Sequence, residues 1–170
     1  MMFGNVKSLR ELFEIELRYA YDCEKKLVEK GLPKMIENVT SPELKTALEG
    51  HLQETRTHVA RLERVFGAIG VEPETRGNEI LDKMTGAAAD SISHIEASPL
   101  RDAALISNGN QVEHYEIALY GTLVSFARTL GLQAAVAPLE ETLNEEKLAD
   151  AKLTKICESL SNGRAATQRA

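Results

Sequence analysis

The stretch "NEEKLADAKL" (residues 144–153) places two acidic residues on a helix face that is otherwise apolar. Glu146 and Asp150 belong to a run of residues that are separated alternately by four and three positions. This spacing is typical of one buried helix stripe, so both carboxylates are expected in the interior. The complete run is Leu139, Leu143, Glu146, Asp150, Leu153, Cys157 and Leu160.

Capping signals place further helices around this one. Ser8 to Glu11 has the pattern of a capping box, and Ser41 and Ser98 are N-cap residues, each followed by a proline at the first helical position. Glycines at positions 70 and 131 are expected helix stops, and Gly31 and Pro33 bend or end the first helix. The expected helices cover residues 8–31 with a further turn to 38, 42–69, 78–96, 99–130 and 138–160.

The helix order predicts an all-α fold without strands. Residues 8–69 and 99–160 form two antiparallel helix hairpins, and a crossover of roughly 28 residues with its own short helix joins them. This arrangement is that of a ferritin-like four-helix bundle. Residues 1–160 are expected to form the bundle, and the polar residues 161–170 are expected to be a disordered tail.

Composition narrows the function classes. The chain has 170 residues, 43% of them hydrophobic, and a net charge of −6. No cluster of Lys or Arg favours nucleic acid, and no apolar run reaches the roughly 18 residues that span a bilayer. The first residues lack an apolar signal core, so we expect a cytoplasmic protein. Cys23 and Cys157 are expected to be buried thiols rather than a disulfide.

Acids inside the apolar stripes follow a repeat. A shift of 92 residues maps Glu24, Glu54 and His58 onto Glu116, Glu146 and Asp150, which suggests two hairpins related by a pseudo-twofold axis. For any one of these acids, a chance position near a stripe is the better explanation. For the whole set, the matched spacings favour a site.

Physical chemistry indicates what such a site holds. A buried, ionised carboxylate without a partner costs several kcal/mol, and a group of them would repel each other and take up protons. The stripes contain no Lys or Arg that could compensate this charge. Divalent cations bind carboxylate oxygens and would neutralise it, so the sequence predicts a dinuclear metal centre.

Four motifs carry a family resemblance: "AYDCEKKL", "EGHLQETRTHVARLERVF", "NQVEHYEIALYGTL" and "LEETLNEEKLADAKL". With them, residues 6–160 resemble the YciF/YciE-like bacterial proteins of the ferritin-like superfamily. The resemblance implies a closed helical bundle, a rubrerythrin-like di-metal site, a homodimer and an association with bacterial stress responses. The ligands that it implies are the terminal carboxylates Glu24 and Glu116, the bridging carboxylates Glu54 and Glu146, the single-metal ligands His58 and Asp150, and the additional carboxylate Glu113.

The ligand set departs from the wider ferritin-like pattern. That pattern carries Glu-x-x-His, a separation of three positions, on two helices. Here the two ligands on each helix are separated by four positions, and Asp150 replaces the second histidine. Oxygen donors with one nitrogen make a hard, anionic site. Such a site favours Fe³⁺, Mn²⁺ or Mg²⁺ more than a histidine-rich site would. Two metal ions are expected, with iron as the favoured metal and manganese and magnesium as the alternatives.

The other histidines and two tyrosines have weaker signals. His51 lies on the stripe of Glu54, and it is interpreted as a ligand, as a partner of a ligand or as a core residue, with the last two favoured. His114 is expected at the periphery and His94 at the surface. Tyr21 and Tyr120 flank the acids; packing is expected, and a hydrogen bond to a ligand or a redox role is the alternative.

Three functions follow as hypotheses. A di-metal oxidoreductase or peroxidase would act on peroxide or oxygen with an external reductant, because no electron-donor domain is recognisable in the chain. A non-catalytic stress protein would use the metal only to hold the bundle together. Iron storage would require a hollow shell, for which no contact residues are recognisable.

Overall fold

The computed structural model describes residues 5–158, and within this range it contains only helices, without any strand. This confirms the predicted all-α class. The elements are α1 (Leu9–Lys26), the π-helical segment η1 (Leu27–Gly31), α2 (Leu32–Asn38), α3 (Pro42–Ala68), α4 (Glu79–His94), α5 (Pro99–Thr129) and α6 (Gln133–Ile156). No helix in the described range is long and apolar enough to cross a membrane.

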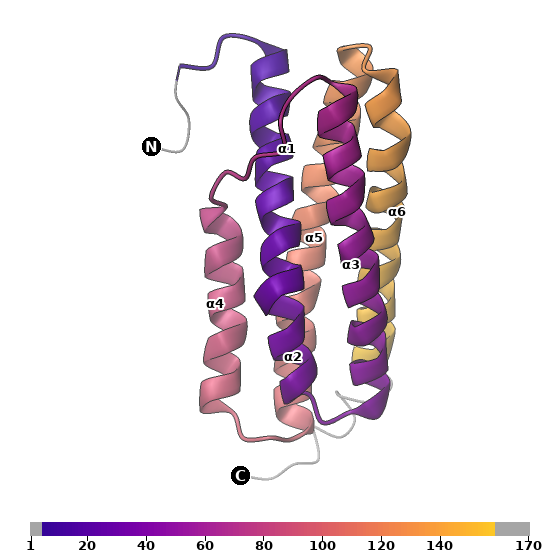
Figure 1. Ribbon diagram of the computed structural model, residues 1–170. Coiled ribbons are helices and arrows are strands. Elements are labelled where there is room, and N and C mark those ends of the chain that lie inside the picture. Colours follow the sequence, from indigo (N-terminus) through magenta and orange to yellow (C-terminus); the bar gives the residue numbers. More distant parts are fainter. Residues whose placement is uncertain (1–4, 159–170) are drawn as a thin grey trace.

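Four long helices form the bundle (Figure 1). α1 packs against α3 and α5, and α6 packs against the same two helices from the other side. α1 and α3 form one antiparallel hairpin, and α5 and α6 form the other. The crossover with α4 returns the chain along the length of the bundle, so α3 and α5 run parallel. This is the predicted ferritin-like arrangement.

The predicted caps are present. The hydroxyl groups of Ser8, Ser41 and Ser98 accept hydrogen bonds from backbone N–H groups three residues further on, at 3.1, 3.3 and 3.4 Å. Gly70 and Gly131 follow the helix ends with φ of 71° and 68°, a region that glycine enters without a steric penalty. Local chemistry therefore sets most of the helix ends.

One helix boundary is confirmed and another differs from the prediction. Helical conformation continues past Gly31 and Pro33 to Asn38, as the expected further turn requires, and the π-helical segment η1 lies where a bend was expected. The last helix begins at Gln133, so the predicted start near Pro138 is wrong. Pro138 lies near the helix start, where it removes one hydrogen bond next to N–H groups that have no intrahelical partner in any case. The predicted helix end at Leu160 and the tail 161–170 lie outside the described residues.

Buried polar residues hold the connections in place. The carboxylate of Asp102, at the start of α5, accepts hydrogen bonds from the backbone N–H groups of Thr40 and Ser41 at 2.7 and 2.9 Å, and from the Thr40 hydroxyl at 2.6 Å. Asn78 precedes α4, donates its N–H to Asp22 at 2.8 Å and donates from its side-chain amide to the Tyr115 hydroxyl at 2.7 Å. These hydrogen bonds therefore hold the N-terminal ends of α3 and α4 against the bundle.

The apolar core has two parts. One contains Phe13, Phe66 and Leu123 towards one end of the bundle, and the other contains Leu44 and Leu105 towards the opposite end. On every long helix, the residues between these two parts include buried polar side chains. The fold therefore leaves a polar layer across the middle of the bundle. Neither cysteine forms a disulfide in the described part of the chain, and Cys23 is fully buried.

Candidate metal centre

The polar layer contains six titratable side chains that could bind metal. They come from all four long helices, and none has more than 7% of its surface exposed. The six are Glu24 on α1, His51 and His58 on α3, Glu113 and Glu116 on α5, and Glu146 on α6.

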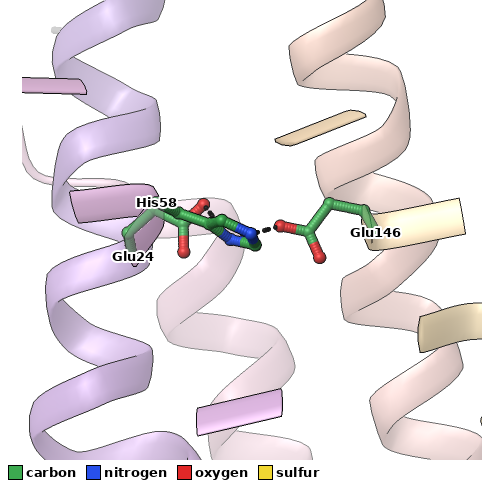
Figure 2. A group of neighbouring side chains, drawn as sticks. All are labelled: Glu24, His58 and Glu146. Atoms are coloured by element: carbon green, nitrogen blue, oxygen red, sulfur yellow. Dashed lines mark ion pairs between the residues drawn. The ribbon is translucent and has the colours of Figure 1, made fainter. Parts of the chain in front are cut away.

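The first group of potential ligand atoms surrounds His58. Figure 2 shows its imidazole between the carboxylates of Glu24 and Glu146. Nδ1 of His58 lies 2.9 Å from Oε1 of Glu146 and 3.4 Å from Oε1 of Glu24. One ligand atom from each of the three residues lies within 4.8 Å of the others, which is the spacing of donors around one cation.

The second group lies around His51. Its Nε2 atom is 3.3 Å from Oε1 of Glu113 and 4.0 Å from Oε2 of Glu146. These three residues also place ligand atoms within 4.8 Å of one another. Glu146 belongs to both groups and contacts each through a different oxygen, so its carboxylate is placed to bridge two cations.

Unsatisfied polar atoms indicate that the layer fits a metal. Seven of its buried side-chain atoms have no hydrogen-bond partner among the described residues, although several of them lie within ion-pair distance of one another. Buried polar atoms normally have such partners, and these are the nitrogen and carboxylate oxygen donors that iron and manganese accept. The atoms are Oε2 of Glu24, Nδ1 of His51, Nδ1 of His58, Oε2 of Glu113, Oε2 of Glu116 and both carboxylate oxygens of Glu146.

Outer contacts orient the histidine of the first group. Nε2 of His58 lies 2.8 Å from Oε2 of Glu145, and the same carboxylate accepts a hydrogen bond from Arg61 at 3.0 Å. Arg61 also donates to Glu141 at 2.7 Å. A carboxylate on one ring nitrogen fixes the imidazole so that the other nitrogen faces the carboxylates of Glu24 and Glu146.

Two carboxylates of the cluster also have partners in the protein. The hydroxyl of Tyr120 donates a short hydrogen bond to Oε1 of Glu24, and the thiol of Cys23 donates to Oε1 of Glu116 at 3.4 Å. Each contact occupies one carboxylate oxygen and leaves Oε2 of the same group unpaired. The alternative role considered for Tyr120, a hydrogen bond to a potential ligand, is therefore present, whereas Tyr21 donates to Glu63 at 2.8 Å.

Burial and the neighbouring charges shift the pKa values of several groups in the cluster. Burial, together with the charges of Glu146 and Glu24, raises the pKa of Glu116 well above its usual value. Burial likewise raises the pKa of Glu146 to about 7. Burial alone would lower the pKa of His58, but the Glu24 and Glu146 carboxylates raise it to about 10. Without metal, the layer therefore compensates its negative charge with protons.

Two of the seven predicted ligands lie at the rim of the layer. The side chain of Glu54 is 53% exposed and touches the cluster only through Nδ1 of His51, at 3.5 Å. Asp150 is 21% exposed and faces His114, at 3.6 Å. A step of four residues turns a side chain by about 40° around a helix, which is enough to move it from the centre of a stripe to its edge. The structure thus brings Glu24, His58, Glu113, Glu116 and Glu146 together, and the proposed twofold equivalence does not extend to Glu54 and Asp150.

Other residues acquire a role that sequence reasoning missed. His51 is a member of the second group of ligand atoms, although its stripe position favoured a core or partner role. Arg61 lies beside the stripe of α3 and is only 6% exposed, but it neutralises Glu141 and Glu145 rather than the cluster. The i, i+7 spacing of His51 and His58 puts both histidines on one helix face, and this spacing is the sequence feature that could have indicated His51 as a second ligand. His94 and His114 are 73% and 70% exposed, as expected.

Fold and site together define a class: a helical bundle of ferritin-like topology with a histidine–carboxylate cluster across its middle. Residues 8–166 match a family model described as a domain of unknown function, DUF892, and the chain belongs to this family. Protein YciF of Escherichia coli K12 is 35% identical to it over 160 residues, which are 89% of this chain and 92% of that protein.

Solved structures give the same relationship. The crystal structure of the E. coli stress protein YciF has a TM-score of 0.87 at 32% identity, over 96% of this chain and all of that chain. YcfI from Rhodopseudomonas palustris, for which a structural role has been suggested, has a TM-score of 0.85 at 37% identity, over 88% of this chain and 95% of that chain. The predicted relationship to YciF-like proteins is therefore confirmed.

Proposed function

We propose that the chain is a metal-binding stress-response protein whose polar layer holds two divalent cations bridged by Glu146. The observation that carries the proposal is the set of facing, buried nitrogen and oxygen atoms without hydrogen-bond partners in the described structure. Glu24 and His58 would complete one metal position, and His51 and Glu113 the other. Glu116 would serve as a further carboxylate, since its charge interacts with those of Glu146, Glu24 and Glu113.

Iron remains the favoured metal, with manganese and magnesium as alternatives. The assignment of His51 adds a second nitrogen donor to a site with four buried carboxylates. Imidazole suits iron better than it suits magnesium, while carboxylates suit manganese and magnesium. A bound redox metal would supply electron transfer to peroxide or oxygen. The protein would contribute the fixed ligands and the Glu145 carboxylate that orients His58.

A small oxidant has a route to the layer. A cavity of about 200 Å³ between α3, α5 and α6 is lined by His51, Glu54 and Glu113. Glu54 is the exposed residue of these three and lies on the solvent side of His51. This opening supports access for peroxide or oxygen to the second metal position, so we propose a peroxidase or oxidase reaction with an external electron donor.

Metal analysis of protein purified from its own host tests the binding proposal. Two ions of iron or manganese per chain are expected, and Glu146→Gln should remove most of this metal. Consumption of hydrogen peroxide by the Fe²⁺-loaded protein then tests the reaction, with His94→Gln as a control at an exposed histidine outside the layer. Metal-free protein from the host would refute the proposal.

A non-catalytic role is the second candidate, and the structural role suggested for YcfI favours it. In that case the metal would hold four helices together through their buried carboxylates. Metal would then raise the melting temperature strongly while peroxide is not consumed. Iron storage is the third candidate; it requires a multi-subunit shell.

A homodimer is part of the proposal, because the resemblance implies one. The exposed side chains of Leu148 and Leu100, at 69% and 48%, offer apolar surface on α6 and α5. Light scattering of the purified chain gives its mass in solution. A mass of two chains would support the dimer, and a large shell would favour iron storage instead.

A further inference from the structure

A cavity of about 450 Å³ lies between α4 on one side and η1, α2 and α5 on the other. Its volume falls within the range of roughly 300–1,000 Å³ that is typical of small-molecule sites. Most of its lining is aliphatic, and the residues that define it best are Leu32, Met35, Leu48, Met84, Ile92 and Val112. A ligand for this cavity must therefore be largely apolar.

The attachment of α4 explains why the cavity stays open. α4 flanks the bundle (Figure 1) and is tied to it near both ends. Near its start, Asp82 forms an ion pair with Lys26 at 2.6 Å, and near its end, Ser91 accepts a hydrogen bond from Asn108 at 3.0 Å. Between these ties the helix presents Ala88, whose small side chain leaves space in front of the bundle.

The inner end of the cavity reaches the polar layer. His51 and Glu113 line it, and each is at least nine-tenths buried. Nδ1 of His51 and Oε2 of Glu113 have no hydrogen-bond partner in the described part of the chain. A ligand in the cavity would thus extend from the surface to the second group of ligand atoms.

The outer end carries positive charge. Lys30 and Lys34 line the cavity, are exposed and lie one helical turn apart. Neither has an ion-pair partner among residues 5–158, whereas the nearby Lys26 is neutralised by Asp22 and Asp82 at 2.7 and 2.6 Å. In a chain with a net charge of −6, these two lysines form a local site for an anionic group.

We propose that this cavity binds a single-chain fatty acid, with its carboxylate at Lys30 and Lys34 and its methyl end towards His51 and Glu113. The opposite orientation would bury the carboxylate away from water and place the methyl end at the exposed residues Lys30 and Lys34, which is unfavourable because burying a charge costs free energy. Binding does not require the proposed metals, since every group named here belongs to the metal-free protein. Failure of one proposal therefore leaves the other standing.

Calorimetric titration of the metal-free, full-length chain with decanoate and dodecanoate, below micelle-forming concentrations, tests the proposal. One molecule per chain is expected, with affinity rising about fourfold for each added methylene group. The double variant Lys30→Gln/Lys34→Gln should weaken decanoate about fivefold and leave the binding of uncharged 1-decanol unchanged. Equal loss for both ligands would contradict the assigned orientation.

Two neighbouring alanines on α4 provide a matched pair. Ala88→Trp fills the cavity and should weaken dodecanoate at least about tenfold, because an indole takes the volume of the alkyl chain. Ala87→Trp adds the same side chain at an exposed position that does not line the cavity, and it should bind as the wild type does. Circular dichroism verifies that both variants fold, and the lysine variant tests the site independently. Unchanged dodecanoate binding by Ala88→Trp would overturn the proposal, and so would the absence of binding by the wild type. If the wild type binds no fatty acid and Ala88→Trp changes the oligomeric state, the cavity would be assigned to a second copy of the chain.

Discussion

Oε1 of Glu146 lies 2.9 Å from Nδ1 of His58, while the other oxygen of the same carboxylate lies 4.0 Å from Nε2 of His51. One side chain of α6 thus faces two histidines that are seven residues apart on α3. Seven residues correspond to about two helical turns, so the histidines lie roughly above one another on the same face. In the proposed centre, a carboxylate between them would join the two metal positions, which would distinguish Glu146 from the other acids.

Removing the bridging carboxylate should affect both metal positions. We expect Glu146→Gln to weaken the binding of both Mn²⁺ ions at least about 100-fold, because a lost ligand costs more than a lost outer partner. Calorimetric titration of the metal-free chain with Mn²⁺ measures this. Glu54→Gln is the matched control on the neighbouring helix, since its 53% exposed side chain should contribute less than about tenfold. Equal losses in the two variants would restore Glu54 as a bridging ligand.

Sequence reasoning predicted the parts of this protein that depend on local chemistry. Ser41 and Ser98 cap their helices as expected, because an N-cap requires only a few neighbouring residues. The convergence of acids in the core also follows from stripe positions. The spacing could not decide whether Glu54 and Asp150 reach the centre, since that depends on how adjacent helices are rotated. His51 has the same stripe signature whether it binds metal or only packs, so its neighbour Glu113 had to be seen in space.

The carboxylate of Glu145, which contacts His58 from outside the cluster, should affect the metal affinity of the first proposed position. Glu145 contacts Nε2 of His58 at 2.8 Å, so Glu145→Gln should weaken one of the two metal ions about 10- to 100-fold through the orientation and basicity of the imidazole. Glu141→Gln is a close control, because Glu141 also pairs with Arg61 and is on the same helix. Stepwise Mn²⁺ titration separates the two ions. If both variants lose affinity equally, the effect comes from Arg61 and not from His58.

Metal-free protein should lose stability as the pH rises through the range in which Glu146 ionises. Burial raises the pKa of Glu146 from 4.5 to about 7, so the folded chain keeps a proton that the unfolded chain has released. The stabilising contribution is complete below the unfolded pKa and is lost as pH rises to the folded pKa, on the order of 3 kcal/mol in total. Urea unfolding of Glu146→Gln at different pH values tests this.

The glutamine variant cannot ionise at this position, so it should lack this part of the pH dependence. Without metal, Glu146→Gln and the wild type should have similar free energies of unfolding near pH 5, and the variant should be the more stable one near pH 8. Saturating Mn²⁺ should reverse the order near pH 8, because only the wild type keeps the bridging ligand. A difference between the two chains that is independent of pH would contradict the assigned ionisation.

The turn between α2 and α3 should depend on one buried carboxylate. Asp102 is 2% exposed and accepts three hydrogen bonds from Thr40 and Ser41, so Asp102→Ala leaves three donors without their acceptor. We expect a loss of about 2–4 kcal/mol in the free energy of unfolding, measured with urea, because hydrogen bonds to charged groups contribute more than neutral ones. Asp90→Ala removes an acid that is 75% exposed on α4 and should change stability by less than about 0.5 kcal/mol. A loss for Asp102→Ala as small as that for Asp90→Ala would mean that water replaces the carboxylate at this turn, and that packing of α2 against α3 holds the connection instead.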